Sequence, residues 1–160
     1  MNGYMKRDSR LSSMLHILLH MAHAGRQLTS EALARMLHTN PVLVRRTLAG
    51  LRERGLVSAE KGHGGGWVIA RALDDITLYD VYEALGEPEL FALGHRSEDS
   101  QCLVEQAVNA SLDQTFAEAK AIVLTQLRGV TLAALSKDFS RRYPSAHHGR
   151  FHVSVVDADP

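Results

Sequence analysis

Residues 29–55 read TSEALARMLHTNPVLVRRTLAGLRERG. They contain the starts of two helices, and a short polar turn lies between the first helix and the second. Thr29 can cap the first helix, because a threonine hydroxyl accepts a hydrogen bond from an early backbone N–H. Asn40 and Pro41 predict the second start, since asparagine caps well and proline is tolerated at the first helical position. Gly55 suits the left-handed residue that follows a helix. The stretch therefore predicts two short helices joined by a tight turn, as in a helix-turn-helix unit.

A further helix is expected upstream, because apolar residues recur there at spacings of three and four up to a break at Ala24-Gly25. Its predicted inward residues are Leu11, Met14, Leu15, Leu18 and Ala22. In the helix that begins at Pro41, the predicted inward residues are Leu43, Thr47, Leu48 and Leu51. This assignment leaves Val42, Arg45 and Arg46 outside the core pattern and next to the polar cap.

Two β-prone runs, residues 56–60 and 67–71, follow these helices, and the loop between them reads KGHGGG over residues 61–66. Two strands joined by a glycine-rich loop predict a hairpin. The loop is not a nucleotide-binding P-loop, because it lacks the Gly-Lys-Ser/Thr ending and leads into a strand. Three helices followed by a hairpin form a winged helix-turn-helix, so the expected fold is mostly α with a small β-hairpin wing.

The second half of the chain is expected to be helical. Thr77 and Asp80 predict a capping box at the start of a helix that Gly86 and Pro88 close. The longest helical pattern covers residues 102–128. A shorter helix is expected after it, over residues 132–142. The apolar stripe of the long helix consists of Val104, Val108, Leu112, Phe116, Ala119, Val123 and Leu127. So long a stripe in a small protein needs a partner surface, and we expect a second copy of the chain to supply it.

The charge of the chain is divided between its two halves. The formal net charge is zero, yet residues 35–71 carry a local charge of +5 and residues 72–110 a local charge of −8. The chain should therefore present one basic and one acidic surface, and the basic one suits an anionic partner such as DNA. The expected parts are a winged helix-turn-helix domain over 1–86, an acidic connection over 87–101, a helical dimerisation and sensing region over 102–142 and a flexible tail over 143–160.

Several classes of protein are excluded by what the sequence lacks. No apolar run approaches the roughly 18 residues that a membrane-spanning helix needs. The first ten residues lack a secretory apolar region, so we expect a cytoplasmic protein with no membrane partner. The single cysteine, Cys102, excludes an intramolecular disulfide. No nucleophile–base–acid set or cofactor loop is evident, so we expect no enzymatic activity and no catalytic residues.

Several sequence blocks, in this order, resemble the Rrf2 family of bacterial transcription regulators. The blocks are Ser9-Arg10-Leu11, residues 29–34 (TSEALA), residues 40–46 (NPVLVRR), residues 51–57 (LRERGLV), residues 62–66 (GHGGG) and residues 76–81 (ITLYDV). The similarity continues weakly from Cys102 to Thr131-Leu132. The resemblance implies a homodimer that binds a palindromic operator in double-stranded DNA, usually as a repressor, with the long helix packed on the other protomer.

The same resemblance, together with the exposed positions of the predicted helices, assigns candidate DNA contacts. Residues expected to meet bases or adjacent phosphates are Asn40, Pro41, Val42, Arg45 and Arg46. Residues expected to position the DNA backbone are Ser9, Arg10, Thr29, Ser30 and Lys61. In the wing, His63 is a candidate for insertion into the minor groove, and Gly64 and Gly65 let the backbone come close to DNA.

One departure from the family pattern concerns a cofactor. Cluster-binding members carry three cysteines before the long helix, and this chain has only the last of them, Cys102. We therefore expect no iron–sulfur cluster, and no other cofactor, which places the chain in the cluster-free branch of the family. Arg45-Arg46 also stands where cluster-binding members have Glu-Gln, so a shared operator sequence is not expected.

Three alternatives stay open at this point. Cys102 lies at the predicted start of a helix, whose dipole favours a thiolate, so it is either a redox or electrophile sensor that gates DNA binding or an unreactive packing residue. His16 and His20, at i and i+4, can chelate zinc or nickel with His23 nearby. Packed or solvent-facing histidines are the favoured interpretation, so no metal site is expected. A winged-helix module that binds proteins would lack the steep salt dependence of DNA binding.

Overall fold

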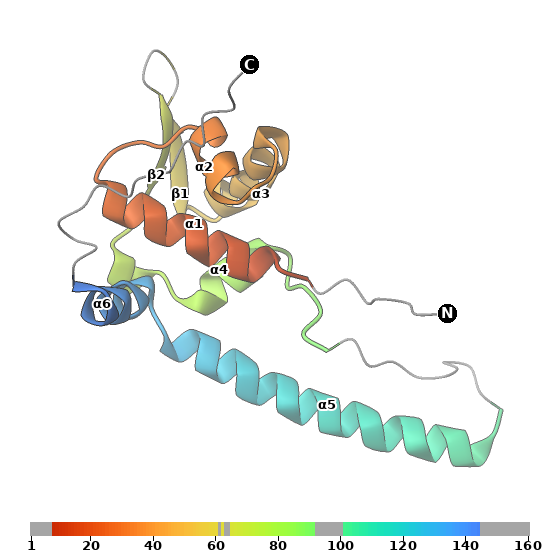
Figure 1. Ribbon diagram of the computed structural model, residues 1–160. Coiled ribbons are helices and arrows are strands. Elements are labelled where there is room, and N and C mark those ends of the chain that lie inside the picture. Colours follow the sequence, from red (N-terminus) through yellow and green to blue (C-terminus); the bar gives the residue numbers. More distant parts are fainter. Residues whose placement is uncertain (1–7, 61, 63–64, 92–100, 145–160) are drawn as a thin grey trace.

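The computed structural model describes residues 8–60, 62, 65–91 and 101–144 (Figure 1). It begins with three helices, α1 (Arg10–Ala24), α2 (Ser30–Met36) and α3 (Pro41–Glu53). A two-stranded hairpin follows, formed by β1 (Val57–Glu60) and β2 (Gly66–Ile69). The remaining elements are the 3-10 helix η1 (Leu73–Asp75) and the helices α4 (Leu78–Ala84), α5 (Leu103–Gly129) and α6 (Leu132–Arg142). This order confirms the expected fold, mostly α with a small β-hairpin wing.

The predicted caps fix the helix-turn-helix unit. The Oγ1 atom of Thr29 accepts a hydrogen bond from the Ala32 N–H at 3.2 Å, and Asn40 Oδ1 accepts one from the Leu43 N–H at 2.8 Å. Each cap satisfies a backbone N–H that has no partner inside its own helix. Gly55 follows α3 in the left-handed conformation, with φ 68°, as predicted from its position after the helix.

The buried face of α1 largely agrees with the prediction, whereas that of α3 differs from it. The buried residues of α1 are Met14, Ile17, Leu18 and Met21. Met14 and Leu18 were expected to point inward, and so were Leu11 and Leu15, which are half-buried and pack against this core; Ala22 is half-buried. In α3 the buried residues are Val44, Leu48 and Leu51, whereas Leu43 is 40% exposed and Thr47 is half-buried. Val44, Leu48 and Leu51 lie at i, i+4 and i+7 on one face, and Leu43 lies about 100° away from Val44 around the helix.

Trp67 joins the wing to the helix-turn-helix unit. The hairpin strands pair antiparallel, with Ala59 opposite Trp67. On its other side, Trp67 exchanges two backbone hydrogen bonds with Leu28, at 3.2 and 2.9 Å. Its indole Nε1–H donates a buried hydrogen bond of 3.0 Å to the hydroxyl of Ser30. Leu28, before α2, therefore pairs with the outer edge of β2 through an isolated β-bridge.

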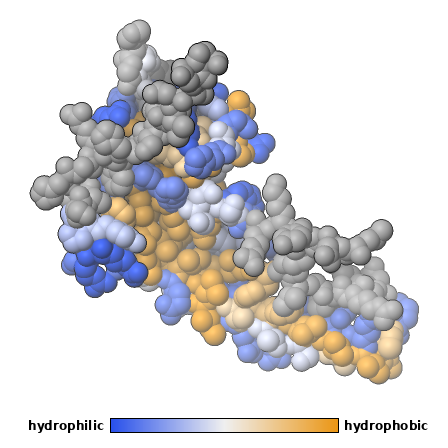
Figure 2. Space-filling view, viewed as in Figure 1, coloured by the Kyte–Doolittle hydropathy of each residue, from blue (hydrophilic) through white to orange (hydrophobic). Residues whose placement is uncertain are grey.

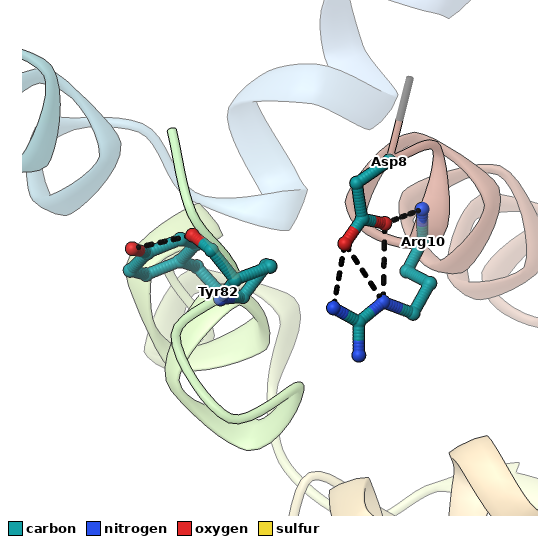
Figure 3. A network of polar contacts seen from close by, with 4 residues as sticks. Asp8, Arg10 and Tyr82 are labelled. Carbon is teal, nitrogen blue, oxygen red and sulfur yellow. Dashed lines mark hydrogen bonds and ion pairs between the residues drawn. The ribbon is translucent and has the colours of Figure 1, made fainter. Parts of the chain in front are cut away.

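The capping box at the start of α4 is confirmed, and it lies where the two halves of the chain meet. Thr77 Oγ1 accepts from the Asp80 N–H at 3.1 Å, and Asp80 Oδ2 accepts from the Thr77 N–H at 2.7 Å. The backbone on either side of Thr77 pairs with residues 130–132, between α5 and α6, through bonds of 2.8 and 2.9 Å. In the same helix the Tyr82 hydroxyl donates to the Pro88 carbonyl at 3.0 Å, and burial raises the pKa of Tyr82 (Figure 3).

The long helix α5 extends away from the rest of the structure (Figure 1). None of its residues is buried against the described part of the chain. Val104, Val108 and Leu112 are 72%, 52% and 37% exposed, and apolar surface lies along the helix in Figure 2. No helix in residues 8–60, 65–91 and 101–144 combines the length and the hydropathy needed to cross a bilayer.

Three of the expected chain parts fall partly outside the described residues, and in the first of them, over 1–86, residues 1–7, 61, 63 and 64 are not described. The other two are the acidic connection, of which residues 92–100 are not described, and the tail, of which residues 145–160 are not described. The boundaries at 86/87, 101/102 and 142/143 stay predictions.

The buried hydrogen bond between Trp67 and Ser30 leads to a stability prediction. Replacing Ser30 with Ala should lower the free energy of unfolding by about 1–3 kcal/mol, because the buried indole N–H loses its acceptor. Urea unfolding followed by far-UV circular dichroism measures the loss. Ser12→Ala, an exposed change in α1, is the control and should leave the unfolding midpoint nearly unchanged. Equal free energies of unfolding for the Ser30 and Ser12 variants would contradict the expected contribution of this hydrogen bond to stability.

Candidate nucleic-acid interface

The N-terminal half of α3 presents a mixed apolar and basic surface. Val42 is 67% exposed and Leu43 40% exposed, and both arginines of the second turn, Arg45 and Arg46, are exposed. The Asn40 cap holds the start of this helix, so these side chains project from a fixed backbone. Pro41 occupies the first helical position and is half-buried beside them.

Arg45 is held by a carboxylate from the neighbouring helix. Its Nη1 lies 3.1 Å from Oε1 of Glu31, in the first turn of α2, and both side chains are more than half exposed. The pKa of Glu31 is lowered, first by a hydrogen bond from its own backbone N–H and further by side-chain bonds from Arg45 and Thr29. Among the described residues, no carboxylate forms an ion pair with Arg46. The two adjacent arginines therefore differ in how firmly they are oriented.

The two candidate residues at the start of α2 have different environments. Thr29 is exposed, and its hydroxyl caps the helix. Ser30 is only 7% exposed, and its hydroxyl accepts the bond from Trp67. The Ser30 hydroxyl is therefore used inside the protein, and the predicted role of Ser30 in positioning the DNA backbone stays a prediction. The N–H of its main chain, in the first turn of α2, is the group of Ser30 best suited to a phosphate.

Ser9 and Arg10 lie at the start of α1, and both are exposed. Asp8 accepts hydrogen bonds of 3.0 Å from the backbone N–H and from Nε of Arg10 (Figure 3). These bonds, the side-chain one above all, hold the pKa of the Asp8 carboxyl below its usual value. The guanidinium of Arg10 is thus paired within the protein but stays accessible to solvent.

The structure describes only part of the wing loop. Lys61, His63 and Gly64 lie outside the described residues, so their predicted DNA contacts stay predictions. The N–H of Gly65 donates to the carbonyl of Gly62 at 2.9 Å, which closes a turn at the wing. A Cβ atom on Gly65 would lie 2.4 Å from the carbonyl oxygen of Glu60, so only glycine fits at this position.

The candidate sensor Cys102 lies where the sequence predicted it. It is the exposed N-cap residue of α5, and its side chain makes no capping hydrogen bond. None of the stripe residues that follow it is buried: Val104, Val108 and Leu112 are exposed, and Phe116, Ala119, Val123 and Leu127 are half-buried. Neither the sensing role nor the dimer contacts are tested by these positions, and both stay predictions.

The three histidines of α1 lie close together. Nε2 of His16 and Nε2 of His20 are 2.8 Å apart, and burial, followed by the charges of His16 and His23, lowers the pKa of His20. His23 contacts α6, where its ring lies 5.3 Å from that of Phe139. Among the described residues, no group of three or more His, Cys, Asp or Glu side chains is placed to hold a metal ion.

Sequence reasoning missed two features of this surface. Leu43 is exposed beside Val42, and Glu31 pairs with Arg45 across the helix-turn-helix. The signal for Glu31 was present, since a tight turn places the first turn of α2 near α3. The exposure of Leu43 could not be predicted without knowing that Val44 is the first buried residue of α3.

Comparison with known proteins identifies the family. The model of the Rrf2 family, described as iron-dependent transcriptional regulators, matches residues 7–138. The chain is 30% identical over 126 residues to YwnA of Bacillus subtilis (strain 168), described as an HTH-type transcriptional regulator, covering 78% of this chain and 92% of that protein. A crystal structure described as a transcriptional regulator from Lactobacillus plantarum aligns with a TM-score of 0.70 and 25% identity, covering 89% of this chain and 97% of that one.

The fold also matches IscR of T. potens, with a TM-score of 0.63 and 19% identity over 87% of this chain and 91% of that one. The family description names iron, so the donor set needs testing. Iron–sulfur clusters are held by four ligands, most often cysteine thiolates. This chain has one cysteine, and its described residues contain no metal-binding group of three, so they do not fit a thiolate-held cluster. On the family match and the relatives, the chain belongs to the Rrf2 family of transcriptional regulators.

Proposed function

We propose that this regulator binds a palindromic DNA operator as a homodimer and acts in the cytoplasm as a repressor. The observation that carries the proposal is the exposed N-terminal half of α3, where Val42, Arg45 and Arg46 project beside a fixed cap. Recognition helices of winged helix-turn-helix proteins enter the major groove by this end. The proposed function is DNA binding and involves no catalysed reaction.

The chemistry of the exposed side chains suits base recognition. An arginine guanidinium can bind O6 and N7 of a guanine through two hydrogen bonds, or grip a phosphate. Val42 and Leu43 offer apolar surface for a thymine methyl group. Asn40 lies at the helix N-terminus, where the helix dipole favours a phosphate. We therefore assign sequence readout to Val42, Arg45 and Arg46.

Contacts to the DNA backbone would come from exposed residues around α3. Thr29 at the start of α2 and Ser9 and Arg10 at the start of α1 are exposed. The wing residues Lys61 and His63 would reach an adjacent groove or phosphate. Contacts of this kind fix register and orientation, whereas base contacts supply specificity.

The unburied apolar side of α5 supports the homodimer. A helix of 27 residues without a buried residue exposes apolar surface to water unless a partner covers it. A second copy of the chain presents the same stripe, which suits the self-complementary interface of a twofold dimer. Two α3 helices related by that twofold axis would each bind one half of an inverted repeat.

The proposal predicts how binding responds to sequence and to salt. Selection from a pool of genomic fragments, at two salt concentrations, should enrich one inverted repeat. The affinity for this repeat should fall steeply as the salt concentration rises. The logarithm of the binding constant falls by about 0.9 for each tenfold increase in salt and for each phosphate that the protein neutralises. No enrichment at either concentration would contradict the proposal and favour a module that binds proteins.

The arginines of α3 should contribute to sequence preference. On the selected operator, Arg45→Ala or Arg46→Ala should weaken binding by about 1–3 kcal/mol and relax the preference at one base position in each half-site. Fluorescence anisotropy with single-base operator variants measures both effects. Arg141→Ala, which removes the same charge from α6, is the matched control and should keep the preference. Unchanged affinity and unchanged preference in both α3 variants would remove their assigned roles.

The dimer interface can be tested on α5. Val108→Asp should shift the chain from dimer to monomer and weaken binding to the inverted repeat, because a carboxylate cannot be buried among apolar side chains without a partner. Size-exclusion chromatography with light scattering reports the mass. Ala110→Asp places the same charge on the opposite side of α5, at nearly the same height, and should stay dimeric. A dimeric Val108 variant would exclude this face as the interface.

A further inference from the structure

The first helix carries a pair of histidines whose coordinating atoms already face each other. His16 and His20 lie one turn apart on α1, with their Nε2 atoms at 2.8 Å and their ring centroids at 4.7 Å. We infer that His16 and His20 form a binding site for a divalent transition-metal ion with square or octahedral coordination, Ni²⁺ or Cu²⁺. The inference does not depend on the proposed DNA contacts.

The pair can bind a metal ion without losing a proton, because the proton that lies between the two Nε2 atoms can move to Nδ1 of the donor ring. In a neutral pair, one Nε2–H donates to the lone pair of the other Nε2. When the donor ring carries its proton on Nδ1 instead, both Nε2 lone pairs point into the space between the rings. Both imidazoles stay neutral in this form, and neutral imidazole is the form that ligates metal ions.

The separation of the two nitrogens is that of a hydrogen bond, and it is also compatible with adjacent ligand positions on one metal ion. With metal–nitrogen distances of about 2.0–2.1 Å, two ligands at 90° lie about 2.9 Å apart, and two at the tetrahedral angle lie about 3.4 Å apart. The observed 2.8 Å is close to the first value. Square and octahedral arrangements are typical of Cu²⁺ and Ni²⁺, whereas structural Zn²⁺ is nearly always tetrahedral. Imidazole also binds Cu²⁺ more tightly than the other divalent first-row ions.

The surroundings leave room for the remaining ligands of the ion. A cavity of about 150 Å³ lies beside the pair and is lined by His16, Leu19, His20, His23 and Phe139. This volume exceeds the roughly 10–15 Å³ that a single water molecule needs, so waters can complete the coordination sphere. His23 lines the same cavity, where the Ser136 hydroxyl lies 3.3 Å from its Nε2.

The cavity also connects the pair to the second half of the chain. Phe139 and Ser136 belong to α6, which packs on α1 at this point. Because no three ligating groups converge among the described residues, the protein supplies two nitrogens and the ion keeps open positions. An ion bound here would stiffen one turn of α1 next to its contact with α6.

The test uses the untagged full-length chain, since a histidine tag would bind the same ions. Equilibrium dialysis against Ni²⁺ should give one bound ion per chain. His16→Ala should weaken this binding by a factor on the order of ten or more, because the chelate loses one of its two nitrogens. His16 is exposed, so the substitution leaves the core intact, and circular dichroism checks that the helix content is unchanged.

The matched control is His38→Asn, which removes an exposed histidine outside the pair. His38 has φ 50°, and asparagine tolerates this left-handed conformation. The control should bind Ni²⁺ like the wild type. With one equivalent of Cu²⁺, the electron paramagnetic resonance spectrum should show coupling to two nitrogens in the wild type and in the control, but to fewer in His16→Ala. Absence of stoichiometric binding, or full binding retained by His16→Ala, would overturn the inference; the second result would assign the ion to other histidines.

Discussion

The contacts of Trp67 join the two parts that the proposed interface needs. The backbone of Trp67 pairs with Ala59 on one side and with Leu28 on the other, and its indole reaches Ser30 at the start of α2. The wing, the segment before α2 and the first turn of α2 are therefore connected through one residue with a buried side chain. Since a buried donor without an acceptor is costly, this link resists independent movement of the wing root and the helix pair.

A second link fixes the base of α5 relative to the DNA-binding half. The backbone around Thr77 pairs with residues 130–132, and the guanidinium of Arg128 lies 3.8 Å from the ring centre of Tyr79 in α4. Arg54 in turn forms an ion pair of 2.8 Å with Glu83 of α4, next to the end of α3. The C-terminal end of α5 is thus connected to α3 through α4. If α5 forms the dimer interface, this chain of contacts would set the spacing between two recognition helices.

Local sequence signals predicted the helix starts well, and they did so for a physical reason. The caps at Thr29, Asn40 and Thr77 depend on residues at most three positions apart, so the sequence alone contains the whole interaction. Helix faces depend on distant packing instead. Val44 rather than Leu43 starts the buried stripe of α3, and Ser30 is drawn into the core by Trp67, which lies 37 positions further along the chain. Neither fact can be read from spacing within one helix.

The candidate interface is basic, although the chain as a whole is neutral and several of its arginines are already paired. Arg10 binds Asp8 and Arg45 binds Glu31, and in both pairs the arginine is more than half exposed. Exposed ion pairs contribute little to stability, because water and salt screen them and each pair costs side-chain entropy. A phosphate or a guanine can therefore replace Glu31 as the partner of Arg45 at little cost. In the DNA-binding role proposed for Arg45, Glu31 would hold the guanidinium near the start of α3 before DNA binds, which would reduce the ordering that binding requires. A carboxylate beside α3 is thus compatible with the proposed DNA contact of Arg45, and it would give Arg45 a more defined orientation than Arg46 before binding.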